Sequence, residues 1–506
     1  MTVDTPSVLL IGLGLHARRI HFPLLTGLAA RGRIAFRGVV DRRAAERDVR
    51  EFLTESPGPP LTLVADLGPA GRLEPETESA LDALVRREGI TAVLVATEPL
   101  AHHRYAEWAL SRGLHVLVDK PPTAHEGLVG DPARSTAMVA DLLGLAETAG
   151  AARRHAAVLT QRRYHRGFRY MRALIEEVRE MTGCPPTSVA IEHTDGEWRM
   201  PWEVLDQDYH PFHRGYGVLL HSGYHAVDTA LWLTGVTGPG HADYQGATVQ
   251  AHFTTLDDVR VALPDDRIRE LLGSAPAPAR AEAGSSLGEI DARLTVGLHR
   301  DGATPTVLSI AALHTSFSRR GWLDSAGRNL YVGNGRKTHE TVSVQQGPFQ
   351  TLRLHSYKAH VEGEQCAEDE VGGGRHWRLQ VFRNASVFPD WKPVREFTLG
   401  ELPADALSDR ARRWLTGSGP AAADSIGTEA KQALIIDFLR AAAAGPRVPG
   451  DRLGSELGEH VVTVSIIGAA YESWASRGTL GPPAIAVKWP PVTSVGSGDK
   501  PDRRLP

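Results

Sequence analysis

Two histidines and an aspartate recur at helical spacing between Gly215 and Gly235. His221, His225 and Asp228 are four and three residues apart, so on a helix they share one face. An imidazole has an ordinary pKa near neutrality, about 6.5, which suits a general base. We therefore predict a helix that lines a cleft. The alternative is that these histidines are ordinary, hydrogen-bonded residues of the surface or core.

A lysine offers a second functional group. Residues 114–118 form an apolar run typical of a buried strand, and Asp119 and Lys120 follow it directly, before two prolines. In parallel α/β sheets, ligands bind beyond the carboxyl ends of the strands. Lys120 is therefore expected beside a cofactor cleft.

A glycine-containing turn lies near the start of the chain. Residues 8–11 form a short apolar strand, and Gly12, Gly14 and Ala17 follow it with G-x-G-x-x-A spacing. Gly12 permits a tight turn, Gly14 lets a pyrophosphate approach the backbone, and Ala17 lets the next helix pack closely. A plain strand-to-helix turn is the alternative.

The next strand, residues 34–40, ends at Asp41. An acidic residue there can bind the two ribose hydroxyls of an adenosine and repel a 2′-phosphate, which favours NAD. Arg42 and Arg43 follow at once and could bind that phosphate, so NADP stays possible. A helix-capping role for Asp41 is the alternative.

The elements that must position these residues change character along the chain. Residues 1–120 alternate strands with helices, which predicts an α/β, doubly wound parallel sheet. From Thr187 onward most segments read as strands, which predicts an α+β domain on a large, mostly antiparallel open sheet. We expect domains at 1–150 and 151–480, with an insertion near 236–345, a last helix at 457–477 and a proline-rich tail at 481–506.

Four motifs occur together and in order, and with them the chain resembles the Gfo/Idh/MocA family of NAD(P)-dependent sugar oxidoreductases. They are the Gly12-x-Gly14-x-x-Ala17 turn followed by His21-Phe22-Pro23, Thr97 with His102, Asp119-Lys120-Pro121, and Gly217-x-x-x-His221-x-x-x-His225-x-x-Asp228. The resemblance covers most of residues 5–235 and the last helix, and it is thin across 236–455.

The resemblance implies an N-terminal Rossmann domain, a second domain with a large open sheet, and a nicotinamide cofactor at their junction. It implies that Lys120 lies beside both nicotinamide and substrate. Three positions depart from the family pattern: Asp119 replaces a glutamate, Tyr216 replaces a glycine, and His221 replaces an aspartate. The expected cofactor-binding residues are Gly12, Gly14, His16, Ala17, Asp41, Arg42, Thr97, His102, Asp119 and Lys120.

Oxidation of a secondary alcohol removes a hydride from carbon and a proton from oxygen. We expect His225 to accept the proton, and Lys120 to stabilise the developing alkoxide. His221 is the third predicted catalytic residue; a neutral imidazole accepts one hydrogen bond but adds no negative charge. A non-catalytic dinucleotide-binding sensor of the same fold is the alternative function.

The expected substrate is a sugar, cyclitol or related polyhydroxylated small molecule. Arg163 and Tyr164 lie at the end of a strand predicted at residues 158–164, which should reach the cleft. Trp198 belongs to an aromatic and acidic segment suited to stacking on sugar rings. Together with Asp228 they are the predicted substrate-binding residues. His210, His213, His221 and His225 also invite a zinc site, but Pro211 breaks the first pair, so no metal is expected.

Composition excludes several classes of protein. The 506 residues carry a formal net charge of −4, which gives no reason to expect a nucleic-acid or membrane partner. Only two cysteines occur, which fits a reducing cytoplasm. No basic leader or apolar run of about 18 residues is present, so neither a signal peptide nor a membrane span is expected. By the family resemblance, a homodimer or homotetramer is expected.

Overall fold

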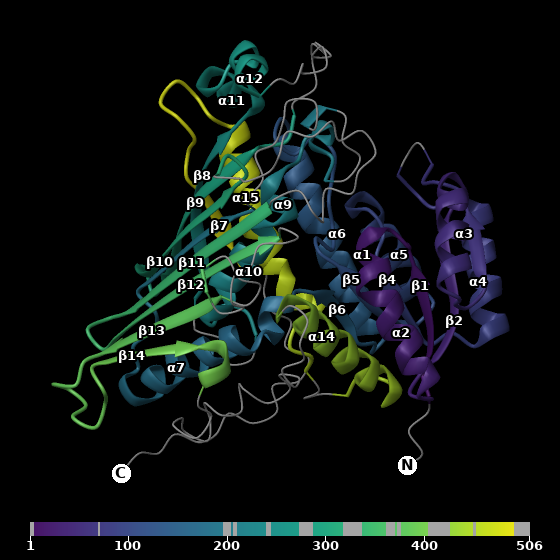
Figure 1. Cartoon of the computed structure of the whole chain (residues 1–506), viewed down its shortest axis with the longest axis horizontal. Coiled ribbons are helices and arrows are strands. Elements are labelled where there is room, and N and C mark those ends of the chain that lie inside the picture. Colours follow the sequence, from purple (N-terminus) through teal and green to yellow (C-terminus); the bar gives the residue numbers. More distant parts are fainter. Residues whose placement is uncertain are drawn as a thin grey trace.

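The chain forms two sheets with helices packed between and around them (Figure 1). The computed structural model describes residues 5–68, 71–195, 204–205, 210–238, 244–272, 287–316, 336–360, 370–371, 376–402, 426–448 and 452–489. Within these ranges no helix is both long enough and apolar enough to cross a membrane.

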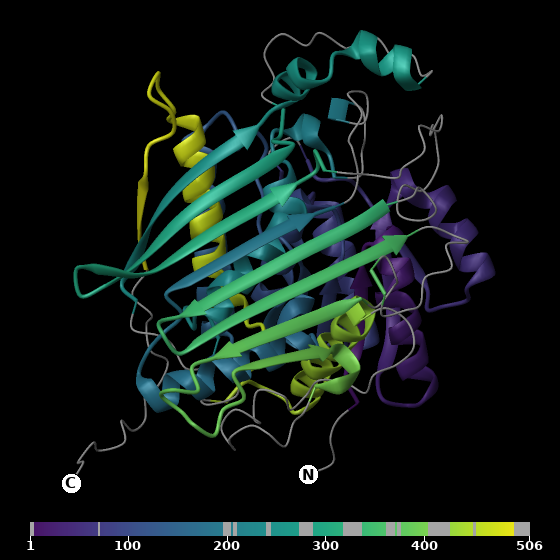
Figure 2. The same cartoon turned by 60° about the vertical axis from the view of Figure 1, so that its left-hand side comes forward.

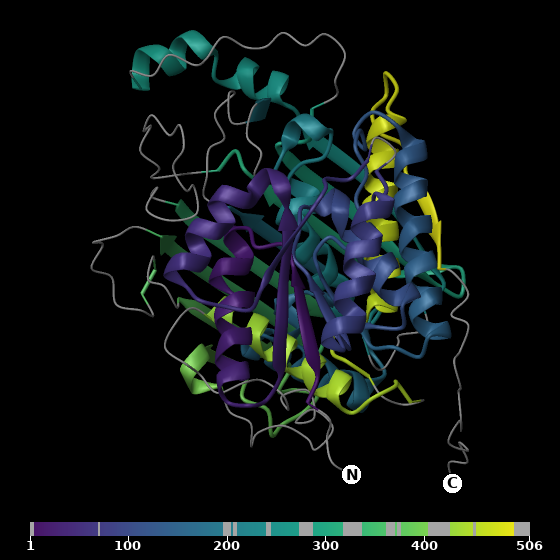
Figure 3. The same cartoon turned by 90° about the vertical axis from the view of Figure 1, so that its right-hand side faces the viewer.

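The first sheet is parallel and has the strand order β3-β2-β1-β4-β5-β6, which is the Rossmann order. Its strands are β1 (Ser7–Ile11), β2 (Ala35–Arg42), β3 (Leu61–Val64), β4 (Ala92–Val95), β5 (His115–Asp119) and β6 (Ala156–Leu159). The central strands are apolar along their length because both faces of the sheet are covered. Helices lie on both sides of it in Figure 3.

The helices that accompany this first sheet alternate with its strands along the sequence, as expected. They are α1 (Leu15–Arg19), α2 (His21–Ala30), α3 (Glu46–Glu55), α4 (Pro75–Glu88), α5 (Pro99–Ser111) and α6 (Pro132–Ala151), with the 3-10 turn η1 (Arg43–Ala45). The helical segment after β1 is broken at Ile20, between α1 and α2, and Pro23 lies in the first turn of α2. Pro23 is tolerated because the first turn of a helix needs no N–H from it.

Among the described residues the second sheet has nine strands, in the order β14-β13-β12-β11-β7-β10-β9-β8-β15, and of their pairings only β7–β10 is parallel. The strands are β7 (Ser188–Thr194), β8 (Gly246–Thr254), β9 (Asp291–Arg300), β10 (Ala303–Leu313), β11 (Arg336–Gln346), β12 (Gln350–His360), β13 (Trp377–Arg383), β14 (Val394–Thr398) and β15 (Ile485–Lys488). The expected α/β plus α+β architecture is confirmed.

One face of this sheet is apolar and carries the helices, and in Figure 2 the strands lie in front of those helices. Buried residues alternate along β9 and β10, which is typical of a sheet covered on one face. The remaining helical elements are η2 (Gln161–Tyr164), α7 (Arg166–Thr182), η3 (Phe212–Arg214), α9 (Val218–His221), α10 (Gly223–Leu233), α11 (Leu256–Ala262), α12 (Asp265–Leu272), η4 (Leu399–Glu401), α14 (Ile426–Ala443), η5 (Leu457–Glu459) and α15 (His460–Ala475).

Helix α15 joins the two halves of the molecule. It packs on α6 of the first sheet and on β8 of the second. A side chain at Gly468 would come within 3.2 Å of Val139 on α6, so the two helices approach closely there. Most of the helix is buried, which explains why its sequence is apolar on nearly every side.

Two predicted elements differ from the structure. The segment containing His221 and His225 is not one helix, because Ser222 separates α9 from α10. The start of α9 is fixed by residue 289, whose backbone and side chain accept the N–H groups of Val218 and Leu219. The strand expected to run to Tyr164 ends at Leu159, and η2 follows it.

Candidate active site

A cleft of about 1270 Å³ lies between the two sheets. The carboxyl ends of β1, β2, β4 and β5 line one wall, as expected for a parallel α/β sheet. The other wall comes from the end of β7, from Thr338 on β11 and from α9 and α10.

The glycine turn fits a dinucleotide pyrophosphate. Gly12 has a φ of +92°, and a side chain there would meet the carbonyl oxygen of Ala96 at 2.5 Å. Gly14 lines the cleft and faces open space, so a phosphate can approach its backbone. Ala17 is fully buried and does not line the cleft, so it fits helix packing rather than direct contact.

Asp41 lies at the end of β2 and is held by the backbone. Its two carboxylate oxygens accept the N–H groups of Leu13 and Arg42, each at 2.7 Å. It lines the cleft and still has lone pairs for ribose hydroxyls. The Arg42 guanidinium also lines the cleft and contacts Asp66 at 3.2 Å on the exposed side. These residues fit the adenosine end of NAD.

His102 ties two cleft-lining turns together. Its Nδ1 lies 2.7 Å from the carbonyl of Pro121, and its Nε2 lies 3.0 Å from the carbonyl of Thr97. The ring is buried, so the contacts fix the turn after β4 against the turn after β5. Thr97 and His102, two of the expected cofactor-binding residues, both line the cleft.

Lys120 follows β5 and points across the cleft toward the second sheet. Its ammonium donates a hydrogen bond to the backbone carbonyl of His221. Burial lowers the pKa of Lys120 to about 8, although Asp119 and Asp195 partly oppose that shift. An ammonium with this pKa is largely charged at pH 7 and can donate to a substrate oxygen.

His225 lies in the first turn of α10 and lines the same cleft. Burial, together with the positive charges of Lys120 and Arg162, holds the pKa of His225 well below its usual range. Its Nδ1 is buried and has no hydrogen-bond partner within the described part of the chain. The ring is therefore neutral near pH 7 and can accept a proton.

The side chain of His221 is packed among other rings. It stacks on His210 with ring centres 4.3 Å apart, and it meets the edges of Phe212 and Tyr216. His221 lines the cleft, yet Lys120 binds its backbone carbonyl. The prediction that His221 and His225 share one helical face is wrong, because the two belong to separate helices.

A charged network lies at the inner end of the cleft, and most of it escaped the sequence analysis. Asp195, just after β7, lies 3.2 Å from Nε2 of His193, accepts from Ser222 at 2.7 Å and lies 2.5 Å from Nε2 of His314. His193 places its other nitrogen 2.9 Å from Glu340. Burial alone would lower the pKa of His193, but the two carboxylates outweigh it and raise that pKa.

One sequence signal could have revealed part of this network. His193 lies near the end of β7 and Asp195 follows that strand directly, as Lys120 follows β5. Residues at such strand ends commonly line the cleft. Glu340 gave no comparable signal, because it lies opposite His193 only through the register of β11 on β7.

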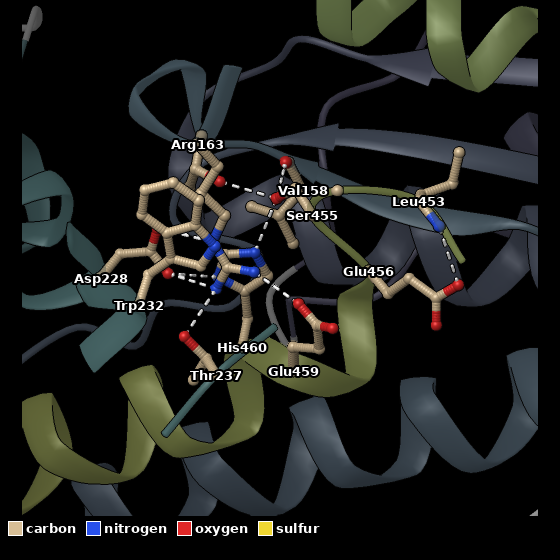
Figure 4. Close-up of polar contacts among 12 residues, drawn as sticks. Val158, Arg163, Asp228, Trp232, Thr237, Leu453, Ser455, Glu456, Glu459 and His460 are labelled. Atoms are coloured by element: carbon tan, nitrogen blue, oxygen red, sulfur yellow. Dashed lines mark hydrogen bonds and ion pairs between the residues drawn. The ribbon is translucent and has the colours of Figure 1, made fainter. Parts of the chain in front are cut away.

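Arg163 and Asp228 do not line the cleft but form a buried ion pair behind it (Figure 4). The guanidinium contacts Asp228 at 2.7 and 3.0 Å and Glu459 at 2.5 Å, and both members of the pair are at most 1% exposed. His460 lies 3.3 Å from the same carboxylate. This placement contradicts their predicted contact with substrate, because the protein already satisfies both groups.

Tyr164 is also turned away from the cleft. Its hydroxyl donates to Asp437 on α14 at 2.5 Å, and Gly454 donates to it from the other side. A direct substrate contact by Tyr164 is therefore not supported. Trp198 lies outside the described residues.

His16, His21 and Asp119 form a compact group at the mouth of the glycine turn. One ligand-type atom from each lies within 4.8 Å of the others, and Nε2 of His21 is 3.1 Å from the Asp119 carboxylate. Burial holds the pKa of His16 well below its usual range. His16 and Asp119, two of the expected cofactor-binding residues, line the cleft, whereas His21 does not line it and contacts Asp119.

Comparison with known proteins supports an NAD-binding Rossmann fold in the first part of the chain. Residues 7–141 match the sequence model of the GFO_IDH_MocA group, described as an oxidoreductase family with an NAD-binding Rossmann fold. No curated protein matches the chain.

Solved structures of similar fold cover nearly the whole chain. An inositol dehydrogenase homologue from Azotobacter vinelandii, solved with NAD+, is 16% identical with a TM-score of 0.59, over 96% of this chain and 98% of the other. UDP-N-acetylglucosamine 3-dehydrogenase from Acidithiobacillus ferrooxidans is 18% identical with a TM-score of 0.51, over 94% and 100%. At this identity the likeness establishes a shared fold.

Proposed function

We propose that the chain is an NAD-dependent oxidoreductase acting on CH–OH groups, because residues 7–141 match the model of the GFO_IDH_MocA oxidoreductase family. The substrate is a secondary alcohol, or the corresponding ketone, of a sugar, cyclitol or related polyhydroxylated small molecule. The inositol dehydrogenase homologue and the sugar-nucleotide dehydrogenase of similar fold support that substrate class.

The observation that carries this proposal is the meeting of Lys120 and His225 in one cleft. Lys120 follows β5 of the first sheet, whereas His225 lies on α10, which packs on the second sheet. Lys120 reaches the carbonyl of His221, just before the helix that bears His225. The glycine turn and Asp41 line the same cleft, at the end suited to a dinucleotide.

When bound, NAD supplies the hydride acceptor. The neutral ring of His225 accepts the hydroxyl proton of the substrate. The Lys120 ammonium donates a hydrogen bond to the same oxygen, which stabilises the alkoxide character of the transition state. In the reverse direction His225 returns the proton to the carbonyl oxygen.

Asp195 supplies negative charge that residue 221 lacks. The family resemblance places an aspartate at 221, whereas this chain has a histidine packed among rings. The charge of Asp195 acts on Lys120 and favours its protonated form. We infer that Asp195 keeps Lys120 charged, a task suited to a carboxylate in the second sheet.

The proposal is tested by separating turnover from cofactor binding. We expect His225→Ala and Lys120→Met to bind NADH as the parent does but to lose about 100-fold or more in turnover. Arg50→Met, which changes an exposed arginine on α3, serves as the control. Parent-like turnover in either cleft variant removes that residue from the mechanism.

A non-catalytic sensor is the second candidate function, and the packed ring of His221 favours it. Binding of NADH without turnover of any polyol, sugar or cyclitol would support the sensor. For either function we predict a homodimer or homotetramer in the cytoplasm. Sedimentation of the purified protein tests the oligomeric state.

A further inference from the structure

Helix α9 is too short to hold its own position. It spans only Val218–His221, and an isolated helix of this length is unstable in water. Gly217, which precedes it, has no side chain that could accept the first N–H groups. Because the carbonyl of His221 accepts the hydrogen bond from Lys120, the contacts that fix α9 also fix that acceptor.

Glu289, shortly before β9 in the sequence, satisfies the first turn of α9 with both its backbone and its side chain. Its backbone carbonyl accepts the N–H of Val218 at 3.0 Å, and its Oε1 accepts the N–H of Leu219 at 2.8 Å. The hydroxyl of Tyr471 on α15 donates to the same Oε1 at 2.9 Å. The carboxyl group of Glu289 therefore connects α9 to α15.

The backbone on either side of this contact leaves little freedom of movement. A side chain at Gly217 would come within 2.0 Å of the carbonyl oxygen of Glu289, and one at Gly288 would come within 2.1 Å of the carbonyl oxygen of Tyr216. Residues 216–217 and 288–289 thus lie in direct contact, with no room for side chains between them. A displacement of Glu289 would therefore displace the start of α9.

The other end of α9 faces the cleft. The carbonyl of His221 accepts the hydrogen bond from the Lys120 ammonium, and the next residue, Ser222, donates to Asp195 at 2.7 Å. The charge of Asp195 acts on the pKa of Lys120 directly. A chain of hydrogen bonds and backbone contacts also runs from Glu289, through the single turn of α9, to Lys120.

The chemical character of Glu289 indicates more than a packing role. Its side chain is fully buried, and burial raises its pKa to about 7 although the hydrogen bonds from Leu219 and Tyr471 oppose that shift. Burying a carboxyl costs free energy, and carboxyls with strongly perturbed pKa values gather at functional sites. Glu289 does not line the cleft, so a functional role has to act through its neighbours.

We propose that Glu289 is a positioning residue: it fixes α9, and α9 holds the carbonyl that orients the Lys120 ammonium toward the substrate oxygen. The effect on turnover rests on the proposed function, whereas the effect on Lys120 does not. A hydrogen bond to a carbonyl stabilises the charged form of a lysine. Displacement of α9 is therefore expected to lower the pKa of Lys120 and to misdirect its ammonium.

The first test measures the pKa of Lys120 without any substrate. The chain contains few lysines, so NMR of protein labelled at its lysine side chains resolves them, and Lys120→Arg assigns the signal. Glu289→Leu removes the acceptor for Leu219, and we expect the pKa of Lys120 to fall by about 0.5 or more. Glu289→Gln keeps an oxygen that accepts the N–H of Leu219, so the pKa of Lys120 should stay near that of the parent.

A control variant separates this effect from a general loss of stability. The buried hydroxyl of Thr306 on β10 contacts the hydroxyl of Tyr244 at 2.5 Å and donates to the carbonyl of Pro186 at 2.6 Å. Thr306 does not line the cleft. Thr306→Val should lower the midpoint of thermal unfolding and leave the pKa of Lys120 unchanged.

Glu289→Asp provides a second test that keeps the charge. The shorter side chain draws the carboxylate back from Leu219, so the pKa of Lys120 should fall here as well. A parent-like pKa of Lys120 in every folded variant of the pair Glu289→Leu and Glu289→Asp overturns the inference. Failure of both variants to fold also overturns it, because residue 289 would then serve the stability of the fold.

Turnover distinguishes this inference from the proposed function. We expect Glu289→Leu to lose about tenfold or more in kcat, since a misplaced catalytic group is costly, and to bind NADH as the parent does. Parent-like kcat in a folded Glu289→Leu overturns the inference and leaves the oxidoreductase intact. A parent protein that oxidises no sugar or cyclitol, together with a lowered pKa of Lys120 in Glu289→Leu, argues against the oxidoreductase and retains the link from Glu289 to Lys120.

Discussion

The ammonium of Lys120, at the end of β5, donates a hydrogen bond to the backbone carbonyl of His221, the last residue of α9. This contact crosses from the first sheet to the helices of the second. It depends on the backbone of residue 221 and not on its side chain, which packs against His210 and Phe212.

His221→Ala is therefore expected to leave Lys120 in place. We expect turnover to fall by less than tenfold, against a loss of about 100-fold or more for Lys120→Met. The lost ring packing should cost stability of about 1–3 kcal/mol, measured by chemical unfolding. A loss of turnover as large as that of Lys120→Met, in a folded protein, would show that the imidazole itself takes part.

The pH dependence of catalysis should reflect the pKa of Lys120, which burial lowers to about 8. The ammonium is present below that pH and is lost as the pH rises through it. We therefore expect kcat/KM for alcohol oxidation to fall above about pH 8, in addition to any change from His225. Lys120→Arg keeps its charge at high pH. If Lys120→Arg retains activity, its kcat/KM should no longer decrease above pH 8. An unchanged decrease would show that another group titrates there.

Substitution of the two glycines in the first turn should have different effects, on stability at Gly12 and on NADH binding at Gly14. At Gly12 the positive φ and the 2.5 Å approach to Ala96 make any side chain strained, so Gly12→Ala should destabilise the fold. At Gly14 the space is open, so Gly14→Ala should fold normally but bind NADH about tenfold more weakly. Gly150→Ala, on α6 with open space around it, is the matched control. Fluorescence titration with NADH and thermal unfolding separate the two effects.

Asp228→Asn should act on stability and not on cofactor affinity. Removing one partner of a buried ion pair costs about 3–5 kcal/mol, and here Arg163 would keep only Glu459 as a carboxylate partner. Burial alone would raise the pKa of Asp228, but Arg163 and His460 outweigh it and lower that pKa. Its stabilising contribution is thus present at neutral pH and lost as the pH falls through the folded-state pKa. A variant of parent-like stability with weakened substrate binding would restore the substrate role predicted from the sequence.

Much of the first sheet could be predicted because the signals are local. The predicted strands at residues 8–11, 34–40 and 114–118 are followed directly by Gly12, Asp41 and Asp119, and strand ends in such a sheet must meet at one edge. The same rule places Lys120 and the glycine turn in one cleft without any knowledge of long-range contacts.

The substrate end could not be predicted in this way. Arg162 and Arg163 are neighbours of one type, and the turn of η2 decides that the first lines the cleft and the second enters the interior. Asp228 lies at helical spacing from His225, yet its partners Arg163 and Glu459 are far away in the sequence. Periodicity identifies a polar position on a helix but cannot say whether protein or ligand satisfies it.

The position of α15 between α6 and β8 has a consequence for folding during synthesis on the ribosome. The residues that cover α6, 460–475, are among the last of the described chain to be synthesised. Until these residues are synthesised, the apolar face of α6 is exposed to solvent. The N-terminal half is then prone to aggregation or to chaperone binding. We therefore expect the folding yield of this protein to depend on keeping the incomplete N-terminal half from aggregating until α15 has been synthesised.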